Sequence, residues 1–282
     1  MTTPEKPTTP EKPPRKPKPQ TVLQVLRRER LSPSMVRLTL GGEQFEKFQP
    51  NEFTDQYVKL VFAKPELGLT APFDMAELKR TLPKEDVPVT RTYTVRRVDQ
   101  QRRQIQIDFV THGDEGLAGP WAARAQEGEG VLMLGPGGKY APDPEAPWHL
   151  FAGDASALPA ISSALESLPE NACGLAFLVV DDAADRLALD APEGVELVWD
   201  ARPGTGADPN RLTELMISRD WPEGAPQVFA HGERESIKQV RRLLKERDIP
   251  KERISISGYW AHGRTEDRFQ AEKREPIGRI ED

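Results

Sequence analysis

Cysteine is almost missing from this chain: Cys173 is the only one among 282 residues. One thiol cannot form an internal disulfide, hold an iron–sulfur cluster or complete a structural zinc site. The sequence therefore predicts a protein of the reducing cytoplasm without a metal centre of its own. Any redox chemistry would require an organic cofactor.

Long apolar runs and an excess of positive charge are missing as well. No segment approaches the roughly 20 apolar residues of a membrane span. No charged segment followed by an apolar one opens the chain as a secretory signal would. The formal net charge of −6 gives no electrostatic attraction to nucleic acid. We expect a monomer without a membrane partner or a nucleic-acid partner.

The first 20 residues differ in composition from the rest. Residues 1–20 hold seven prolines and five basic residues, with almost nothing apolar. Proline removes amide donors and fixes φ, so this stretch predicts a disordered, extended tail. Its composition suits either a docking arm or a solubilising segment. The remaining length suffices for two domains, each with its own core.

Short apolar segments at close spacing fill residues 21–145. This succession is typical of a small antiparallel barrel, here with six strands. A polar excursion, with one short helix expected at Asp74–Leu82, interrupts it. The expected strands lie at Val22–Leu26, Met35–Leu40, Tyr57–Phe62, Thr92–Val98, Gln104–Thr111 and Gly130–Gly135.

Strands alternate with helices in residues 146–258. This rhythm predicts a parallel sheet with helices on both faces, and it places a domain boundary near residue 145. The expected strands are His149–Gly153, Leu175–Val180, Val195–Trp199, Gln227–His231 and Ile254–Tyr259. The expected helices are Ala155–Leu168, Asn210–Ile217 and Glu233–Arg247.

The strand that carries Arg91, Tyr93 and Thr94 has the chemistry of a flavin site. Arg91 and Tyr93 share one face of a strand. A guanidinium binds phosphate in bidentate fashion, an aromatic ring lies along a flavin, and a threonine hydroxyl or its amide can donate to a ring nitrogen. The alternative is an ordinary edge strand whose Arg91 and Arg96 are solvated.

The loop after the next strand suits an anionic group. Gly113, Gly116 and Gly119 allow the backbone to approach a ligand closely, and a helix expected near Ala118–Ala122 leaves free N–H groups. His112 could bind a diphosphate or pack on an adenine, or it is an ordinary surface or core histidine. Trp121 either covers the ligand or belongs to the core.

The order of these motifs resembles the siderophore-interacting proteins, which are flavin-dependent ferric-siderophore reductases of the ferredoxin-reductase-like superfamily. The similarity covers roughly residues 21–275. It rests on Arg91-Thr-Tyr-Thr-Val-Arg96, Asp108-Phe-Val-Thr-His112-Gly-Asp-Glu-Gly116 and Trp121-Ala122. Two later segments follow in the family's order: Phe151-Ala-Gly-Asp-Ala-Ser-Ala-Leu-Pro-Ala-Ile161 and Ser257-Gly-Tyr-Trp-Ala-His-Gly-Arg-Thr-Glu266.

The resemblance implies a flavin-binding barrel followed by a nicotinamide-binding α/β domain, with residues 259–282 as a C-terminal extension near the flavin mouth. FAD would be bound by Arg91, Tyr93, Thr94, Asp108, His112, Gly113, Ala118, Gly119, Trp121 and Ala122.

The nicotinamide cofactor would face the strand ends of the second domain. Ligands of open α/β sheets lie beyond the carboxyl ends of strands, although no Gly-x-Gly-x-x-Gly fingerprint is present here. Asp154 has the alternative role of capping the following helix. The residues assigned to this cofactor region are Gly153, Asp154, Ala157, Gly232, Glu233 and Trp260.

Two positions depart from the family pattern, because Pro120 and Ala261 stand where the family commonly has arginine. Basic side chains at these places would attract an anionic ferric siderophore. Lys59 matches a further basic position of the family. Either Arg264, Arg268 or Lys273 replaces the missing cations, or the substrate is less acidic, or the reaction is a different one. We assign Lys59, Arg264 and Lys273 to the substrate.

The resemblance implies an oxidoreductase with FAD as cofactor and NADPH or NADH as electron donor. Its substrate would be a ferric siderophore, whose iron leaves as Fe(II). No side chain is needed as acid, base or nucleophile, so no catalytic residue is assigned. The alternatives are a flavin reductase with another acceptor and a carrier of flavin or siderophore without catalysis.

Overall fold

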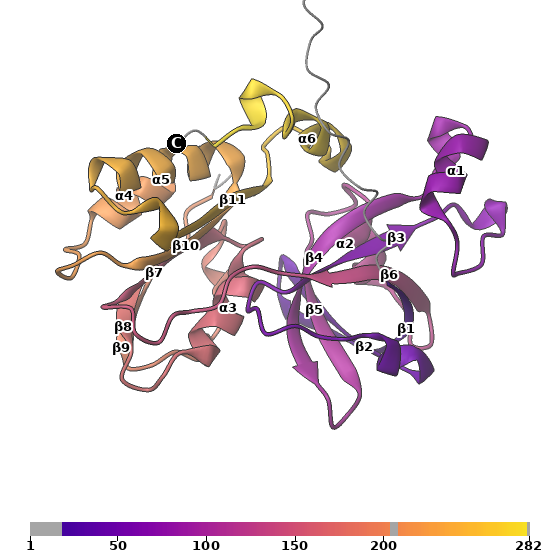
Figure 1. Cartoon of the computed structure of the whole chain (residues 1–282), viewed down its shortest axis with the longest axis horizontal. Helices are drawn as coiled ribbons and strands as arrows, with labels where there is room; N and C mark the ends of the chain where they lie inside the picture. The colour runs from indigo at the N-terminus through magenta and orange to yellow at the C-terminus, as the bar shows by residue number, and fades with distance from the viewer. Residues whose placement is uncertain (1–18, 204–207, 281–282) are drawn as a thin grey trace, which may run out of the picture.

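The computed structural model describes residues 19–203 and 208–280. Two lobes lie side by side, a closed antiparallel barrel and a parallel sheet with helices (Figure 1). This is the predicted fold class. The predicted disorder of the proline-rich tail falls almost wholly on residues 1–18, which lie outside the described residues.

The barrel contains all six predicted strands, in the order β1-β2-β5-β4-β3-β6. Four strands, β1, β2, β4 and β6, are longer than predicted. The largest extension is in β1, because the polar segment Arg27–Arg30 pairs with β2 although its side chains are exposed. Backbone pairing therefore extends beyond the apolar pattern that periodicity detects. The strands are β1 (Gln20–Ser32), β2 (Met35–Gly41), β3 (Tyr57–Phe62), β4 (Val89–Asp99), β5 (Gln104–Val110) and β6 (Gly130–Gly137).

Two short helices accompany the barrel. Helix α1 (Met75–Thr81) begins where Asp74 accepts hydrogen bonds from the amides of Ala76 and Glu77, which confirms the predicted helix. Helix α2 (Ala118–Arg124) packs Ala118 and Ala122 into the barrel core. Single 3₁₀ turns lie at η1 (Glu43–Lys47), η2 (Pro65–Leu67) and η3 (Lys84–Asp86).

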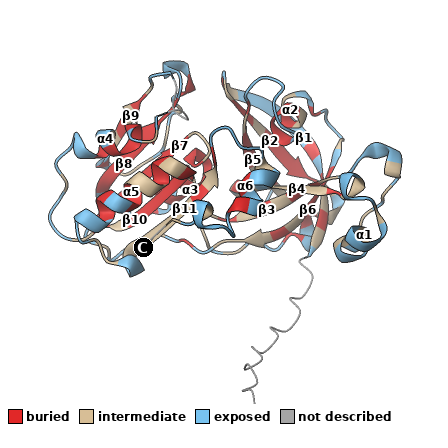
Figure 2. Ribbon diagram, turned by 90° about the horizontal axis from the view of Figure 1, so that it is seen from above, coloured by how far each residue is buried: buried red, intermediate tan, exposed pale blue. Residues whose placement is uncertain are grey.

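The second lobe is a five-stranded parallel sheet in the order β11-β10-β7-β8-β9. Its central strands are buried on both faces (Figure 2), as near-continuous apolar runs predict. The strands are β7 (His149–Asp154), β8 (Cys173–Val179), β9 (Gly194–Asp200), β10 (Gln227–Glu233) and β11 (Ile254–Trp260). The helices are α3 (Leu158–Ser167), α4 (Arg211–Ile217) and α5 (Arg234–Glu246), and η4 (Ala183–Asp185) and η5 (Lys251–Arg253) are 3₁₀ turns.

The helices begin slightly later than predicted. Helix α3 starts at Leu158 rather than Ala155, because the chain first makes a turn in which the Ala157 amide donates to the Asp154 carbonyl. Helix α5 starts after Glu233, whose side chain caps it. Asp154 is not the cap of α3, so the alternative role considered for it is not the one observed.

The two lobes are joined by a mixed apolar and polar interface. Met35 of the barrel belongs to the apolar cluster that lies under α3. Arg96 Nη1 donates to Glu166 Oε2 at 2.9 Å. Ser32 Oγ and the Ser34 amide donate to Asp185 Oδ1 at 2.7 and 2.9 Å. Close packing and satisfied polar groups together hold the lobes in a defined relation.

The chain ends by crossing from the sheet back towards the barrel. Helix α6 (Glu266–Glu272) lies between the lobes (Figure 2), and η6 (Pro276–Gly278) follows it. Asp267 of α6 accepts from Arg91 of β4, while Glu272 accepts from Arg234 of α5. No helix in residues 19–203 and 208–280 is long and apolar enough to cross a membrane.

Candidate active site

A cavity of about 800 Å³ lies between the barrel and the carboxyl edge of the parallel sheet. This volume falls within the usual range for organic ligands, about 300–1,000 Å³. Strands of both lobes and helix α6 supply its walls. It brings together nine residues predicted from sequence: Lys59, Arg91, Tyr93, Thr94, Asp108, His112, Asp154, Trp260 and Lys273.

The Tyr93 ring forms part of the barrel wall of this cavity. It packs on Phe109 with ring centroids 4.4 Å apart, so its plane is fixed before any ligand binds. Burial raises the pKa of Tyr93, with a smaller contribution from Glu266, which keeps its hydroxyl neutral. Thr94 is buried beside it and pairs with Tyr57 of β3. A fixed, neutral aromatic surface suits a flat conjugated ring.

Arg91 is the cation next to this aromatic surface. Its guanidinium donates to Asp267 Oδ1 and Oδ2 at 3.0 and 3.4 Å. The Asp267 side chain is 69% exposed, so this ion pair contributes little to stability. Phosphate oxygens can offer Arg91 the same bidentate geometry with more charge.

Asp108 lines the cavity, but both of its oxygens are already engaged. Arg37 of β2 donates to them through Nε at 2.6 Å and Nη2 at 2.8 Å. This bond to Asp108 raises the pKa of Arg37, against the effect of burial. Arg37 was missed by sequence reasoning. Its signal was a single basic residue inside the apolar strand Met35–Gly41.

The loop before α2 is open, whereas α2 itself is packed. Gly113 and Gly116 have φ values of 56° and 81°, and a Cβ at either position would meet no atom within 4 Å. A Cβ on Gly119 would meet the Val110 carbonyl at 2.9 Å. Trp121 Nε1 donates to Glu129 at 2.6 Å. These contacts hold α2 in place, while direct contacts of Ala118, Gly119, Trp121 and Ala122 with a cofactor stay predictions.

Asp154 is the polar centre of the sheet's carboxyl edge. Oδ1 accepts from the Ser156 amide and hydroxyl at 2.9 and 2.5 Å. Oδ2 accepts from the Glu233 amide at 2.7 Å and from Trp260 Nε1 at 2.8 Å. Burial raises the pKa of Asp154, and the four donated hydrogen bonds oppose that rise. One side chain thus ties together the ends of β7, β10 and β11.

Two glycines make this close approach of the strands possible. A Cβ on Gly153 would lie 2.6 Å from the His231 carbonyl and 2.7 Å from the Ala157 side chain. Gly232 has a φ of 152°, and a Cβ there would lie 2.7 Å from Asp154 Oδ2. These small residues therefore allow the strands to pack closely at the sheet edge. Gly153, Ala157 and Gly232 do not line the cavity.

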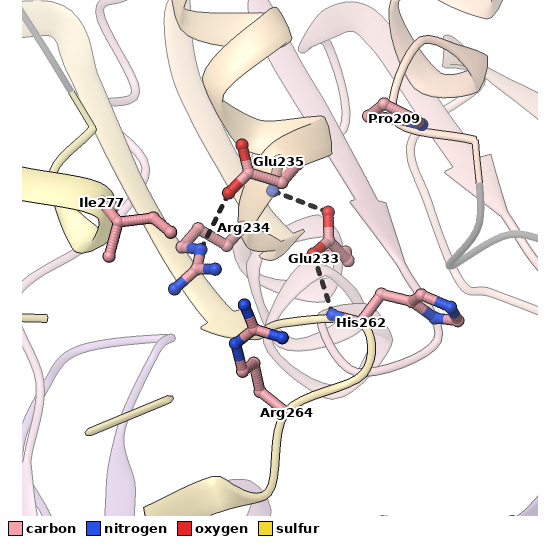
Figure 3. A pocket seen from close by; sticks show the side chains of 7 residues that line it. All are labelled: Pro209, Glu233, Arg234, Glu235, His262, Arg264 and Ile277. Atoms are coloured by element: carbon pink, nitrogen blue, oxygen red, sulfur yellow. Dashed lines mark hydrogen bonds and ion pairs between the residues drawn. The ribbon is translucent and has the colours of Figure 1, made fainter. Parts of the chain in front are cut away.

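Glu233 and Arg264 lie at a second, smaller cavity of about 380 Å³ (Figure 3). Glu233 accepts from the amides of Glu235, Ser236 and His262. Arg264 Nε donates to the buried Glu272 at 3.0 Å. The structure does not bring Arg264 to the main cavity with Lys59 and Lys273.

The main cavity is also lined by residues of β10 and β11 that were not assigned from sequence. Ser255, Ser257 and Tyr259 alternate along β11, and His231 of β10 pairs with Ser257. Alternation by two puts side chains of a strand on one face. That pattern, at a strand end expected to face the cofactor, was the available signal.

Comparison with known proteins agrees with the geometry. The fold is that of ferredoxin reductases, as in the ferredoxin reductase of carbazole 1,9a-dioxygenase (TM-score 0.60, 14% identity, 86% of this chain and 69% of that one). Residues 24–140 match the siderophore-interacting FAD-binding domain, so the protein is an FAD-dependent oxidoreductase. Residues 146–263 match the siderophore-interacting protein domain. The chain belongs to the siderophore-interacting protein family.

Three relatives cover nearly the whole chain. An uncharacterized protein of Mycobacterium tuberculosis is 43% identical over 92% of this chain and 96% of its own. Ferric vibriobactin reductase ViuB of Vibrio cholerae is 35% identical over 89% and 93%. A crystal structure of a siderophore utilization protein from T. fusca has a TM-score of 0.77 and 38% identity, covering 88% of this chain and 95% of that one.

The residues around the cavity fit the cofactor that these comparisons indicate. FAD is the cofactor. Tyr93 offers the aromatic surface, Arg91 the cation for phosphate, and the open loop at Gly113 room for the backbone to approach. The carboxyl edge of the sheet is where the second dinucleotide is expected.

Proposed function

We propose that this protein is an NAD(P)H-dependent ferric-siderophore reductase that releases iron as Fe(II). One observation supports this most directly: a single cavity is walled by the barrel residues Arg91 and Tyr93 and by the sheet-edge residues Asp154 and Trp260. A donor at the sheet edge and a cofactor on the barrel would thus meet. The similarity to ferric vibriobactin reductase and to the NADPH-dependent ferric-chelate reductase of Escherichia coli, 30% identical over 84% of this chain, supports the reaction class.

The protein's part in this reaction is to bind and orient. Bound FAD would supply the chemistry that links a two-electron donor to a one-electron acceptor. Tyr93 orients the ring, Arg91 binds phosphate oxygens, and Asp154 fixes the strand ends against which the donor lies. No side chain acts as an acid, base or nucleophile in this scheme.

Lys59 and Lys273 would receive the ferric siderophore. Lys59 Nζ donates to Thr92 at 2.9 Å, at the cavity wall. Lys273 Nζ lies 4.5 Å from the centre of the Phe269 ring. Burial lowers the pKa of Lys273; Glu266 raises it and Lys59 lowers it, and all three residues line the cavity. Two cations beside the cavity would attract an anionic ferric chelate. Its oxygen ligands hold Fe(III) more strongly than Fe(II) because Coulomb attraction grows with the charge of the ion, so reduction releases the iron.

An anaerobic experiment tests the proposal. Purified protein is loaded with FAD, reduced with one equivalent of NADPH or NADH, and mixed with a ferric trishydroxamate or triscatecholate and a coloured Fe(II) chelator. The flavin absorbance should return while two equivalents of Fe(II) complex form. Flavin that stays reduced with every ferric chelate, while free flavin or another acceptor restores its absorbance, would exclude siderophore reduction. Absence of NAD(P)H oxidation would indicate a carrier.

Location and assembly belong to the same proposal. We infer a cytoplasmic monomer, supported for the location by Cys173, which is exposed and free. A light-scattering measurement of the purified protein would show one chain of 31.6 kDa. A stable dimer mass would contradict the monomer without affecting the proposed reaction.

A further inference from the structure

A histidine lies at the base of the main cavity, where the sheet faces the barrel. His231 lies two residues before the end of β10 and is only 5% exposed. Its ring packs against Phe229 at 4.1 Å and Tyr259 at 4.9 Å between centroids, so its orientation is fixed by aromatic neighbours. It lines the cavity together with Ser255 and Ser257 of the adjacent strand.

The hydrogen bonds of His231 are incomplete. Nε2 lies 3.1 Å from Ser255 Oγ, whereas Nδ1 is buried and has no hydrogen-bond partner among the described residues. The hydroxyl of Ser257 makes only a long bond of 3.4 Å to the Gly258 carbonyl. Buried polar atoms are usually paired, and an unpaired one marks a place where a ligand atom is expected.

The imidazole of His231 is neutral at ordinary pH. Burial, with a smaller contribution from the charge of Lys273, lowers the pKa of His231 to about 3, although the backbone of Ser257 acts in the opposite direction. A neutral imidazole has one donor and one acceptor nitrogen. It also avoids repulsion of an oxidised nicotinamide ring, which carries a positive charge. The three side chains together offer donors and acceptors but no net charge.

A primary carboxamide matches this set of groups, because it has both an N–H₂ donor and a carbonyl acceptor. We propose that His231, with Ser255 and Ser257, binds the carboxamide of the nicotinamide ring and is a positioning residue for the electron donor. The inference rests on the proposed function. It is supported by the site's location: His231 pairs with Gly153 of β7 and Ser257 of β11, next to Asp154, and all three side chains line the same cavity as Tyr93 and Trp260.

Binding measurements on the FAD-loaded protein test this role. Calorimetric titration with NAD⁺ and NADP⁺ should show that His231→Leu raises the Kd of the preferred nucleotide about tenfold, the effect of losing one or two buried hydrogen bonds. His231→Asn, which keeps an amide near the place of Nδ1, should recover most of the affinity. Ser257→Ala should weaken binding several-fold and serves as a second test if His231→Leu does not fold.

His149 supplies a matched control. It is a buried histidine on β7 that is 1% exposed, also lacks a partner at Nδ1 among the described residues, and does not line the cavity. His149→Leu should leave the nucleotide Kd unchanged, and no variant should change FAD affinity more than twofold. Equal weakening by His149→Leu, or no weakening by His231→Leu and Ser257→Ala, overturns the inference. A wild-type protein that binds no FAD overturns the proposed function instead.

Discussion

At the scale of single residues, the ion pair of Arg37 and Asp108 shows how a side chain can border the site without being free to bind there. Asp108 was assigned to the cofactor by its motif. Its side chain is only 2% exposed, however, and its two oxygens accept hydrogen bonds from Nε and Nη2 of Arg37. A buried ion pair adds little net stability, but breaking it leaves an uncompensated charge. Asp108 therefore fixes β2 against β5 at the cavity wall.

Replacing Arg37 with methionine should lower the unfolding free energy by about 3 kcal/mol at neutral pH, because Asp108 stays buried without its cation. Urea unfolding at pH 7 measures this loss. The double variant Arg37→Met/Asp108→Leu should regain most of the lost stability, because it has no buried charge. If Arg37→Met is as stable as wild type, Asp108 does not depend on Arg37 for compensation of its charge.

The sequence predicted some of these residues and not others for a simple reason. Arg91, Tyr93 and Thr94 form one short motif, so their joint location follows from the strand that carries them. Arg37 pairs with Asp108 71 residues away, and no local pattern records such a pairing. His231 was seen only as part of a strand end, because an unpaired ring nitrogen is a property of packing.

At the scale of elements, helix α6 is held by a buried carboxylate with three guanidinium partners. Glu272 accepts from Arg234, Arg264 and Arg268 at 2.6, 3.0 and 2.7 Å. Arg234 is the largest cause, followed by Arg268, of the lowering of the pKa of Glu272 to about 2. Arg264 and Arg268 were two of the candidates to replace the family's missing arginines at the substrate site. Both donate to Glu272 of α6 instead. Lys273 alone of the three reaches the main cavity.

The attachment of α6 should depend on pH in a defined window. Because the pKa of Glu272 is lowered in the folded state, its contribution is complete above the ordinary value of 4.5 and is lost as the pH falls towards 2. Glu272→Gln should therefore unfold at lower urea than wild type at pH 7, with the difference shrinking between pH 4.5 and 2.

The exposed Glu275 provides the comparison, because Glu275→Gln should leave the urea midpoint nearly unchanged at every pH. Circular dichroism measures all three proteins under the same conditions. A Glu272→Gln deficit that is constant over the whole pH range would show that the three arginines do not hold the carboxylate in its charged form.

At the scale of the whole molecule, the order of elements could be predicted but the contact between the lobes could not. Alternation of strands and helices after residue 145 indicated the parallel sheet, which begins with β7 at His149. The interface depends on Ser32 and Asp185, which are 153 residues apart. A pair so distant in sequence produces no periodic pattern in the sequence, although it helps to fix how the two lobes lie around the cavity.

The polar ties between the lobes should matter for electron transfer more than for ligand affinity. The double variant Glu166→Gln/Asp185→Ala removes the partners of Arg96, Ser32 and Ser34. The rate of flavin reduction by excess NAD(P)H should fall several-fold, because orientation of donor and acceptor is lost. Stopped-flow absorbance measures this rate.

Glu170→Gln, an exposed change just beyond α3, is the control and should leave the rate unchanged. FAD affinity of the double variant should stay within about twofold of wild type, since the barrel residues Arg91 and Tyr93 are intact. An unchanged reduction rate in the double variant would show that apolar packing alone sets the position of the lobes.

The indole of Trp260 and the turn after β7 are bonded to the same carboxylate, that of Asp154, which is 106 residues from Trp260. The last segment of the chain is therefore part of the carboxyl edge of the parallel sheet, where the electron donor is expected to bind. A protein truncated before Trp260 would lose helix α6 and the hydrogen bond that the Trp260 indole donates to Asp154 at the end of β7. Shortening the C-terminus should damage donor binding before it damages flavin uptake.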